Sequence, residues 1–231
     1  RLGAMSLGEY RKLGYLPQAL ANYMALLGWS PGDDQELFDF DELKKRFALE
    51  RVSRSSAVFD LVKLNWINGE HIRRMDDKVY VKAGIQYILQ EKIVDKELYR
   101  KRPEWYEKVL LALKDNIQCF KDLADRIPLF CDSIEHENPA VLKTDSARLV
   151  LSQLLSILKE TETIDDEAYN KILKELKKKT KVKGKDLFLP LRVAFTGREH
   201  GPDLKRFVTL LGKNICIKRI EKALQCGSGG A

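Results

Sequence analysis

Several patterns that mark common enzyme and metal sites are missing from this 231-residue sequence. It has no phosphate-cradling glycine loop, no H-E-x-x-H motif and no nucleophile elbow, so we expect no catalytic residues within the chain. The cysteines form no C-x-x-C pair and the three histidines are scattered, so we expect no metal site. Cysteines without a pairing pattern are usual in a reducing compartment, which favours a cytoplasmic protein.

Long apolar runs are also absent. No window approaches the length needed to cross a bilayer, and the first residues show no cleavable signal pattern, so we expect no membrane partner. No stretch alternates apolar and polar residues as a half-buried strand does. Apolar residues recur at helical spacing instead, so the expected fold class is all-α.

The sequence does carry an excess of positive charge. Its net charge of +7 and its pI near 9.1 favour contact with a polyanion, although many basic proteins bind nothing acidic. The run from Lys177 to Lys185 is the densest basic stretch. We interpret it as a solvated helix end; the alternative is a set of salt-sensitive contacts to a phosphate backbone.

Helix signals divide the chain into parts of different character. Up to about Met75 the pattern is broken by glycine and proline, and a helix that starts after the N-cap Asp60 is expected to end at Asn68-Gly69. From Asp76 onward the helical period is regular. Trp29, Trp66 and Trp105 sit at apolar helical positions, which predicts core packing for all three. The expected parts are residues 1–75, residues 76–226 and a flexible Gly- and Ser-rich tail at 227–231.

One stretch, residues 185–204, departs from ordinary amphipathic helix. Its apolar run ends at Gly197, a short loop follows, and Pro202 is expected to open the next helix. Arg192 lies inside the apolar run, where a charge is costly unless it has a partner. Two interpretations stay open: a helical hairpin whose arginines pair with local acids, or a pocket for an anionic polymer with unstacked bases.

Separate blocks of the chain resemble one family. They are residues 13–23 (LGYLPQALANY), 26–30 (LLGWS), 47–53 (FALERVS), 57–60 (AVFD), 63–69 (KLNWING) and 190–197 (PLRVAFTG). In this order they resemble the C-terminal half of bacterial-type glutamyl-tRNA synthetase, a class I aminoacyl-tRNA synthetase. The resemblance extends over nearly the whole chain. The resemblance implies a stem-contact helical region in the first part and an α-helix cage anticodon-binding domain in the second.

The resemblance also implies an activity for the full-length protein. It implies a glutamate–tRNA ligase that attaches glutamate to tRNA(Glu) with ATP and Mg²⁺, as a cytoplasmic monomer. Arg1 resembles the last residue of the family's ATP-binding lysine-serine-lysine-arginine loop, so the catalytic domain is expected upstream. This chain alone is then expected to be inactive and to bind no cofactor. A stand-alone helical RNA-binding or protein-interaction module is one alternative, and a duplicated synthetase that charges tRNA(Gln) is another.

The resemblance assigns anticodon contacts to five residues. Arg192 falls where the family has an arginine that faces an anticodon base. Gly201, Pro202 and Leu204 fall beside it, where the backbone can approach base edges and the leucine can pack on a splayed base. Asn116 departs from the arginine that members selective for one tRNA carry there, which leaves acceptance of tRNA(Gln) open.

Three further residues are implied on the stem side. Lys63, Asn65 and Arg73 are the candidates for contacts to phosphate and ribose. The alternative interpretation is that Asn65 and Asn68 only cap helix ends.

Overall fold

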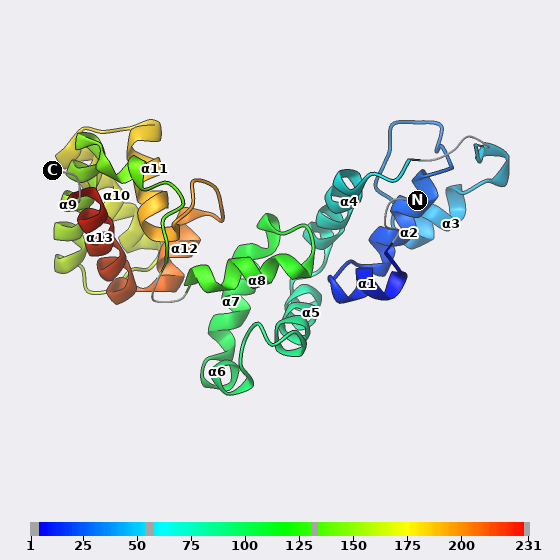
Figure 1. The fold of residues 1–231 in the computed structure, drawn as a ribbon, viewed down its shortest axis with the longest axis horizontal. Helices are drawn as coiled ribbons and strands as arrows, with labels where there is room; N and C mark the ends of the chain where they lie inside the picture. The colour runs from blue at the N-terminus through cyan, green and yellow to red at the C-terminus, as the bar shows by residue number, and fades with distance from the viewer. Residues whose placement is uncertain (1–4, 54–57, 131–133, 229–231) are drawn as a thin grey trace. The chain divides into compact units, whose positions relative to one another are not determined.

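The computed structural model describes residues 5–53, 58–130 and 134–228, which form helices joined by turns (Figure 1). Arg1 lies outside the described residues. Among those residues there is no strand, and the one β pairing found is an isolated bridge between Trp29 and Val52. The all-α prediction is therefore confirmed.

The chain divides into two compact units, with the boundary between Ala124 and Asp125. The first unit thus holds both the expected stem-contact region and the first part of residues 76–226. The functional division at residues 75 and 76 stays a prediction. The helices and 3-10 turns of the first unit are α1 (Leu7–Lys12), α2 (Pro17–Leu26), α3 (Phe40–Arg46), η1 (Leu49–Arg51), α4 (Leu61–Arg74), α5 (Asp77–Gln90), α6 (Lys96–Lys101), α7 (Pro103–Leu113), η2 (Lys114–Asn116) and η3 (Phe120–Asp122).

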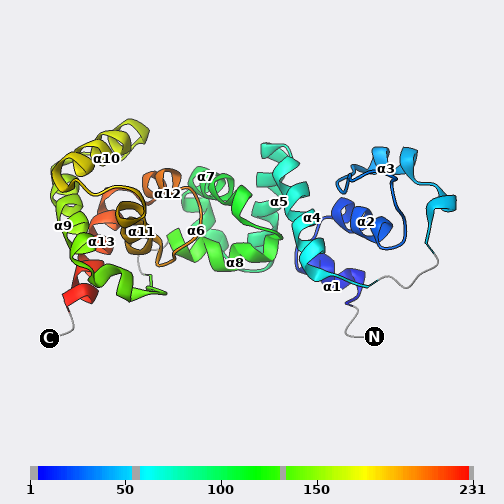
Figure 2. The same cartoon turned by 90° about the horizontal axis from the view of Figure 1, so that it is seen from above.

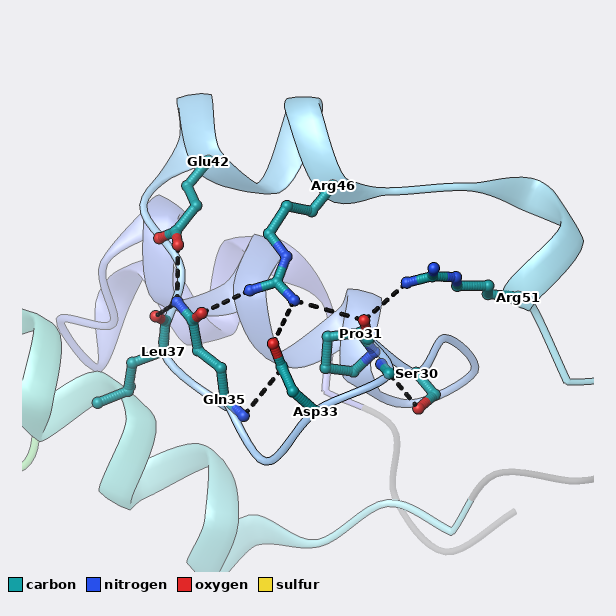
Figure 3. Close-up of polar contacts among 9 residues, drawn as sticks. Ser30, Pro31, Asp33, Gln35, Leu37, Glu42, Arg46 and Arg51 are labelled. Atoms are coloured by element: carbon teal, nitrogen blue, oxygen red, sulfur yellow. Dashed lines mark hydrogen bonds and ion pairs between the residues drawn. The ribbon is translucent and has the colours of Figure 1, made fainter.

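Polar contacts hold the turn between α2 and α3 (Figure 3). Arg46 of α3 donates to Gln35 Oε1 at 2.5 Å and to Asp33 Oδ2 at 2.6 Å. Arg51 donates to the carbonyl oxygen of Pro31 at 2.7 Å, and Arg46 reaches the same oxygen at 3.4 Å. Two arginines thus fix the turn, which leaves both of them committed to structure.

Helix α4 runs without a break through Asn68-Gly69, so the predicted helix end there is wrong. Asp60 caps the helix as expected, accepting from the backbone of the next turn. Asn68 is fully buried; its side chain accepts from the backbone N–H of Leu16 at 2.8 Å and donates to the carbonyl of Gln118. A Cβ on Gly69 would lie 3.4 Å from Gln118 Cα, so the backbone of Gln118 passes close to the glycine. The pair serves distant contacts instead of a turn.

A left-handed glycine makes a second close approach in this unit. Gly14 has φ 78°, and a Cβ there would lie 2.5 Å from Phe120 Cβ. The N–H of Phe120 donates to the Gly14 carbonyl at 3.3 Å. The Phe120 ring stacks with Tyr80 and with Tyr87, at 5.8 Å between ring centres in both cases. These contacts join residues 118–120 to the start of the chain.

The prediction that all three tryptophans lie in the core is confirmed for Trp29 alone. Trp29 is buried against Phe38. Trp105 is half-buried beneath the guanidinium of Arg102, 4.0 Å from the ring centre. Trp66, on α4, is 38% exposed, because α4 turns its buried side toward α2 and leaves the tryptophan on the other side.

The second unit is a bundle around α9, which packs against α10, α11 and α13 (Figure 2). Thr144 and Asp165 cap α9 and α10 through their side chains. Helix α8 (Leu123–Arg126) spans the boundary between the units. The other elements are η4 (Ile127–Phe130), η5 (Pro139–Lys143), α9 (Asp145–Glu160), α10 (Asp166–Thr180), α11 (Gly184–Thr196), α12 (Leu204–Leu211) and α13 (Lys213–Ser228).

Candidate nucleic-acid interface

The corner predicted in residues 185–204 is formed by the end of α11, a loop and the start of α12. Gly197 ends α11 as expected, with φ 73°. A Cβ on Gly197 would lie 2.1 Å from the carbonyl oxygen of Glu135, so only glycine allows the backbones to come this close. The N–H of Glu137 donates to the Gly197 carbonyl at 2.8 Å. The segment before η5 thus braces the corner.

Helix α12 begins at Leu204 and not at Pro202, so the predicted start is wrong by two residues. Asp203 is the N-cap, and its side chain accepts from the N–H of Arg206 at 2.9 Å. Proline has no side-chain oxygen that could accept this hydrogen bond, whereas the carboxylate of Asp203 does accept it. Asp203 is therefore the N-cap, and the first helical residue is Leu204. Pro202 lies before the cap, where its carbonyl is used by another residue.

That residue is Arg192. Its half-buried side chain donates from Nη1 to the Pro202 carbonyl oxygen at 2.8 Å. In the part of the chain that the structure describes, Arg192 forms no ion pair, whereas Arg198 in the neighbouring loop lies 3.6 Å from Glu137. A guanidinium carries five N–H groups, so one bond to a neutral carbonyl fixes its orientation without cancelling its charge.

Tyr169 of α10 belongs to the same neighbourhood. Burial raises the pKa of Tyr169 to about 12; the carboxylate of Asp203 adds to the rise and the guanidinium of Arg192 opposes it. The hydroxyl therefore stays protonated at neutral pH and keeps a proton to donate.

The structure brings together the four candidates of this corner with different exposure. Gly201 is partly exposed, and a Cβ there would lie 3.9 Å from Arg192 Nη1, an ordinary van der Waals distance, so the glycine lies directly beside the guanidinium. Pro202 is buried, and Leu204 is only 6% exposed. A base that packs against this corner would meet Arg192 and the Gly201 backbone before it met Leu204.

Sequence reasoning missed the buried arginine behind the corner. Arg219 of α13 is 1% exposed and donates to the carbonyls of Phe195 and Leu129, the latter at 2.8 Å. It thereby ties the last turn of α11 to η4. Its sequence context gave no signal for this burial, since the adjacent Lys218 is exposed.

The two cationic stem candidates lie on α4, and each has a carboxylate partner. Lys63 lies 2.5 Å from Glu36. Arg73 donates to Glu70 Oε1 from Nε at 3.1 Å and from Nη2 at 2.5 Å. All four side chains are partly exposed, so phosphates could replace these carboxylates at low cost.

The third stem candidate, Asn65, accepts a hydrogen bond from the hydroxyl of Tyr15. Neither Asn65 nor Asn68 lies at a helix end, so the capping interpretation is wrong for both. Tyr15 and Leu16, just before α2, supply a partner to each, and Asn68 also donates to the carbonyl of Gln118.

Asn116, the remaining anticodon candidate, is partly exposed at the end of η2. It belongs to the first compact unit, whereas Arg192 belongs to the second, so neither unit holds the full predicted set. Nearby, Lys114 is held by the carbonyl of Met75 and by Asp77 Oδ1 at 2.7 Å.

Other chemistry finds little support among the described residues. They contain no group of three metal-ligating side chains, and none of their helices is long and apolar enough for a membrane span. Burial raises the pKa of Cys119 to about 11 and that of Cys216 to about 12, so neither is a reactive thiolate at neutral pH. The lysines between Lys177 and Lys185 are exposed around the end of α10.

Comparisons with known proteins match two parts of the chain to family models. The family model for the anticodon binding domain matches residues 81–224, and that for the catalytic domain of class I tRNA synthetases (E and Q) matches residues 1–66. A glutamate–tRNA ligase of Clostridioides difficile is 36% identical over 224 residues, which are 95% of this chain and 45% of that protein. One of Heliobacterium modesticaldum is 38% identical over 229 residues, 97% of this chain and 46% of that protein. The chain thus spans a little under half the length of these relatives.

Solved structures show the same fold. A glutamate tRNA ligase from Elizabethkingia meningosepticum superposes with a TM-score of 0.73 at 24% identity, over 94% of this chain and 42% of that one. A glutamate-tRNA synthetase from Elizabethkingia anophelis gives a TM-score of 0.73 at 26% identity with the same coverage. The resemblance found in the sequence is confirmed, and the chain belongs to the anticodon-binding domain family of class I aminoacyl-tRNA synthetases.

Proposed function

We propose that this chain is the tRNA-recognition part of a glutamate–tRNA ligase, which attaches glutamate to tRNA(Glu) using ATP and Mg²⁺. The observation that carries the proposal is the match of the anticodon-binding domain over residues 81–224, joined to an oriented, partly exposed arginine within it. In this proposal the ATP and glutamate sites lie in the rest of a class I catalytic domain. The chain alone activates no glutamate, and the whole enzyme acts as a cytoplasmic monomer.

The corner is suited to an unstacked anticodon base. Arg192 offers N–H donors whose direction is set by the Pro202 carbonyl, and the partly exposed Gly201 beside it has no side chain to cover them. Single-stranded RNA loops are read in this way, through base edges and through stacking on side chains. Arg219 holds the carbonyl at the end of α11 and so keeps the corner in one geometry.

The stem side is suited to weaker contacts. Lys63 and Arg73 would exchange their carboxylate partners for phosphates, so their net contribution to affinity is small. Phosphate contacts position the RNA and carry no sequence information. The exposed lysines after Lys177 add attraction that falls as salt rises.

Binding of three tRNA transcripts to this chain tests the proposal. We expect tRNA(Glu) to bind at least tenfold more tightly than an unrelated tRNA of the same length at the same salt concentration. Equal affinity for both would contradict a recognition role. Glutamate-dependent exchange of pyrophosphate into ATP by the pure chain would contradict the assignment of glutamate activation to the rest of a class I catalytic domain.

The transcript of tRNA(Gln) separates a second candidate function. Asn116 takes the place of an arginine that selective members of the family carry, which favours relaxed reading of the first anticodon base. Binding of tRNA(Gln) within a few-fold of tRNA(Glu) would support a synthetase that serves both tRNAs. If Asn116→Arg then lowers the affinity for tRNA(Gln) alone, Asn116 is the cause of the relaxed reading.

A further inference from the structure

The carboxylates around the corner decide how much of the Arg192 charge is open to a ligand. The corner loop, residues 198–203, holds two of them, Glu199 and Asp203. Asp203 is committed to α12, because its carboxylate accepts from a backbone N–H in the first turn at 2.9 Å. Glu199 lies two positions before Gly201, which is beside the guanidinium of Arg192. Since carboxylates and guanidinium groups form strong paired hydrogen bonds, the direction of Glu199 decides whether the guanidinium is neutralised.

The structure joins the Glu199 carboxylate to a neutral partner. Its Oε1 accepts from the side-chain amide of Asn138 at 2.7 Å. Within the described ranges of the chain, Glu199 forms no ion pair. Arg198, the next cation along the loop, lies 3.6 Å from Glu137 instead. The acid of the loop is therefore held by an amide, and both neighbouring arginines are left to other partners.

Asn138 forgoes a local hydrogen bond to make this contact. It occupies the N-cap position of η5, where an asparagine side chain usually accepts from the backbone of the first turn. Among the described residues its side chain makes no such cap bond. The amide instead donates to Glu199, sixty-one residues further along the chain. A partly exposed asparagine with this choice of partner is placed to hold that carboxylate.

The path of the loop does not depend on the Asn138 side chain. The backbone N–H of Glu137 donates to the Gly197 carbonyl at 2.8 Å. Thr196 Oγ1 accepts from the first N–H of the loop at 3.1 Å. Both bonds remain when the amide is removed. What the amide adds is the direction of the Glu199 side chain.

We propose that Asn138 is a positioning residue for RNA binding, which holds the Glu199 carboxylate away from Arg192 and so keeps the guanidinium available to an anticodon base. Without the amide, Glu199 can turn toward Arg192 and pair with it. An incoming base must then displace a carboxylate before it reaches the guanidinium. The inference rests on the proposed function, since it takes RNA as the ligand of Arg192.

A double-mutant cycle in tRNA(Glu) binding tests this role. Asn138→Ala should lower the affinity about three- to tenfold, between the effects of exposed and of buried ion pairs. Adding Glu199→Gln should bring the affinity back to within twofold of the unaltered chain, because no carboxylate is left to pair with Arg192. Glu199→Gln alone should change it less than twofold. Urea unfolding first shows that each variant is folded.

The matched control changes the acid next to Asn138. Glu137→Gln removes the carboxylate that lies beside Arg198, and its effect should be the same in the unaltered chain and in Asn138→Ala. A loss in Asn138→Ala that Glu199→Gln does not recover would overturn the proposal, because the amide would then act on the shape of the loop. Recovery by Glu137→Gln to the same extent, or an unchanged affinity in Asn138→Ala, would overturn it as well.

The preference of the unaltered chain for tRNA(Glu) over an unrelated tRNA separates this inference from the proposed function. Absence of that preference would contradict the proposed function and this inference with it. If the preference is present and Glu199→Gln recovers nothing in Asn138→Ala, only the positioning role of Asn138 is contradicted.

Discussion

Helices α4 and α11 both carry cations that the family resemblance assigns to RNA contact, but the two helices support these cations differently. On α4, Lys63 and Arg73 are each joined to a carboxylate. On α11, Arg192 is joined to the neutral carbonyl of Pro202. A carboxylate partner lowers the attraction between a cation and a phosphate and must be displaced, whereas a carbonyl partner orients the cation and leaves its charge intact. The difference predicts weak positioning by α4 and selective reading by α11.

The largest expected effect comes from the glycine that ends α11. Gly197→Ala puts a Cβ 2.1 Å from the Glu135 carbonyl at a left-handed residue, so we expect a loss of about 3–4 kcal/mol in the free energy of unfolding. The control is Gly184→Ala at the other end of α11, where φ is 59° and no atom lies within 4 Å of the added Cβ. It should cost only about 1–2 kcal/mol. Urea unfolding curves measure both; equal losses would show that the contact with Glu135 is unimportant.

The corresponding test on α4 is Asn68→Leu. It leaves the N–H of Leu16 and the carbonyl of Gln118 without their partner in a buried site, which costs about 1–3 kcal/mol for each group left unsatisfied. We expect a loss of about 3 kcal/mol. Asn65→Ala, three residues earlier, removes one partly exposed bond and should cost about 1 kcal/mol or less. An unchanged free energy of unfolding in Asn68→Leu would mean that Asn68 is not needed to hold the segments around Leu16 and Gln118.

Charge on α4 can be changed without touching its cations. Glu70→Gln frees Arg73 from its carboxylate, so we expect tRNA affinity to rise about two- to fivefold at low salt, in line with the small energy of exposed ion pairs. The gain should be the same for all tRNAs and should disappear at high salt. Filter binding at several salt concentrations measures it. A gain limited to tRNA(Glu) would make α4 a reader instead of a positioning element.

The basic run after Lys177 should have the least selective effect. Replacing Lys178, Lys179 and Lys181 with glutamine should weaken binding to all tRNAs alike and flatten the dependence of affinity on salt. Lys179 already pairs with Glu175 at 2.7 Å, so its share is expected to be the smallest of the three. A loss confined to one tRNA would show that the run recognises sequence or shape.

Local signals predicted the start of α4 and the end of α11, because caps depend on residues close in sequence. Asp60 and Thr144 cap their helices through neighbouring N–H groups, and Gly197 ends α11 by its own backbone conformation. The Asn68-Gly69 pair misled for the opposite reason: its partners lie about fifty residues away in sequence.

The candidate site follows the same rule. The position of Arg192 in an apolar run marked it as unusual, but its partner at Pro202 lies across a corner whose geometry no local pattern gives. Arg219 shows the limit most clearly, since it contacts a carbonyl ninety residues earlier in the chain. The exposure of Trp66 could not be predicted from the sequence either, because an apolar residue in a helix does not show which side of that helix the fold buries.

Binding of two transcripts to two proteins tests the central claim that Arg192 reads the anticodon. The transcripts are tRNA(Glu) and the same tRNA with a changed anticodon; the proteins are the unaltered chain and Arg192→Gln, both first shown to be folded by urea unfolding. A well-placed arginine–base contact gives roughly 1–3 kcal/mol of discrimination. Arg192→Gln should therefore lower the affinity for the native transcript about ten- to a hundredfold. The affinity for the changed transcript should fall less than about threefold on the same substitution, because the contact is already lost in that transcript. Equal weakening of both transcripts, or none of either, would contradict the claim.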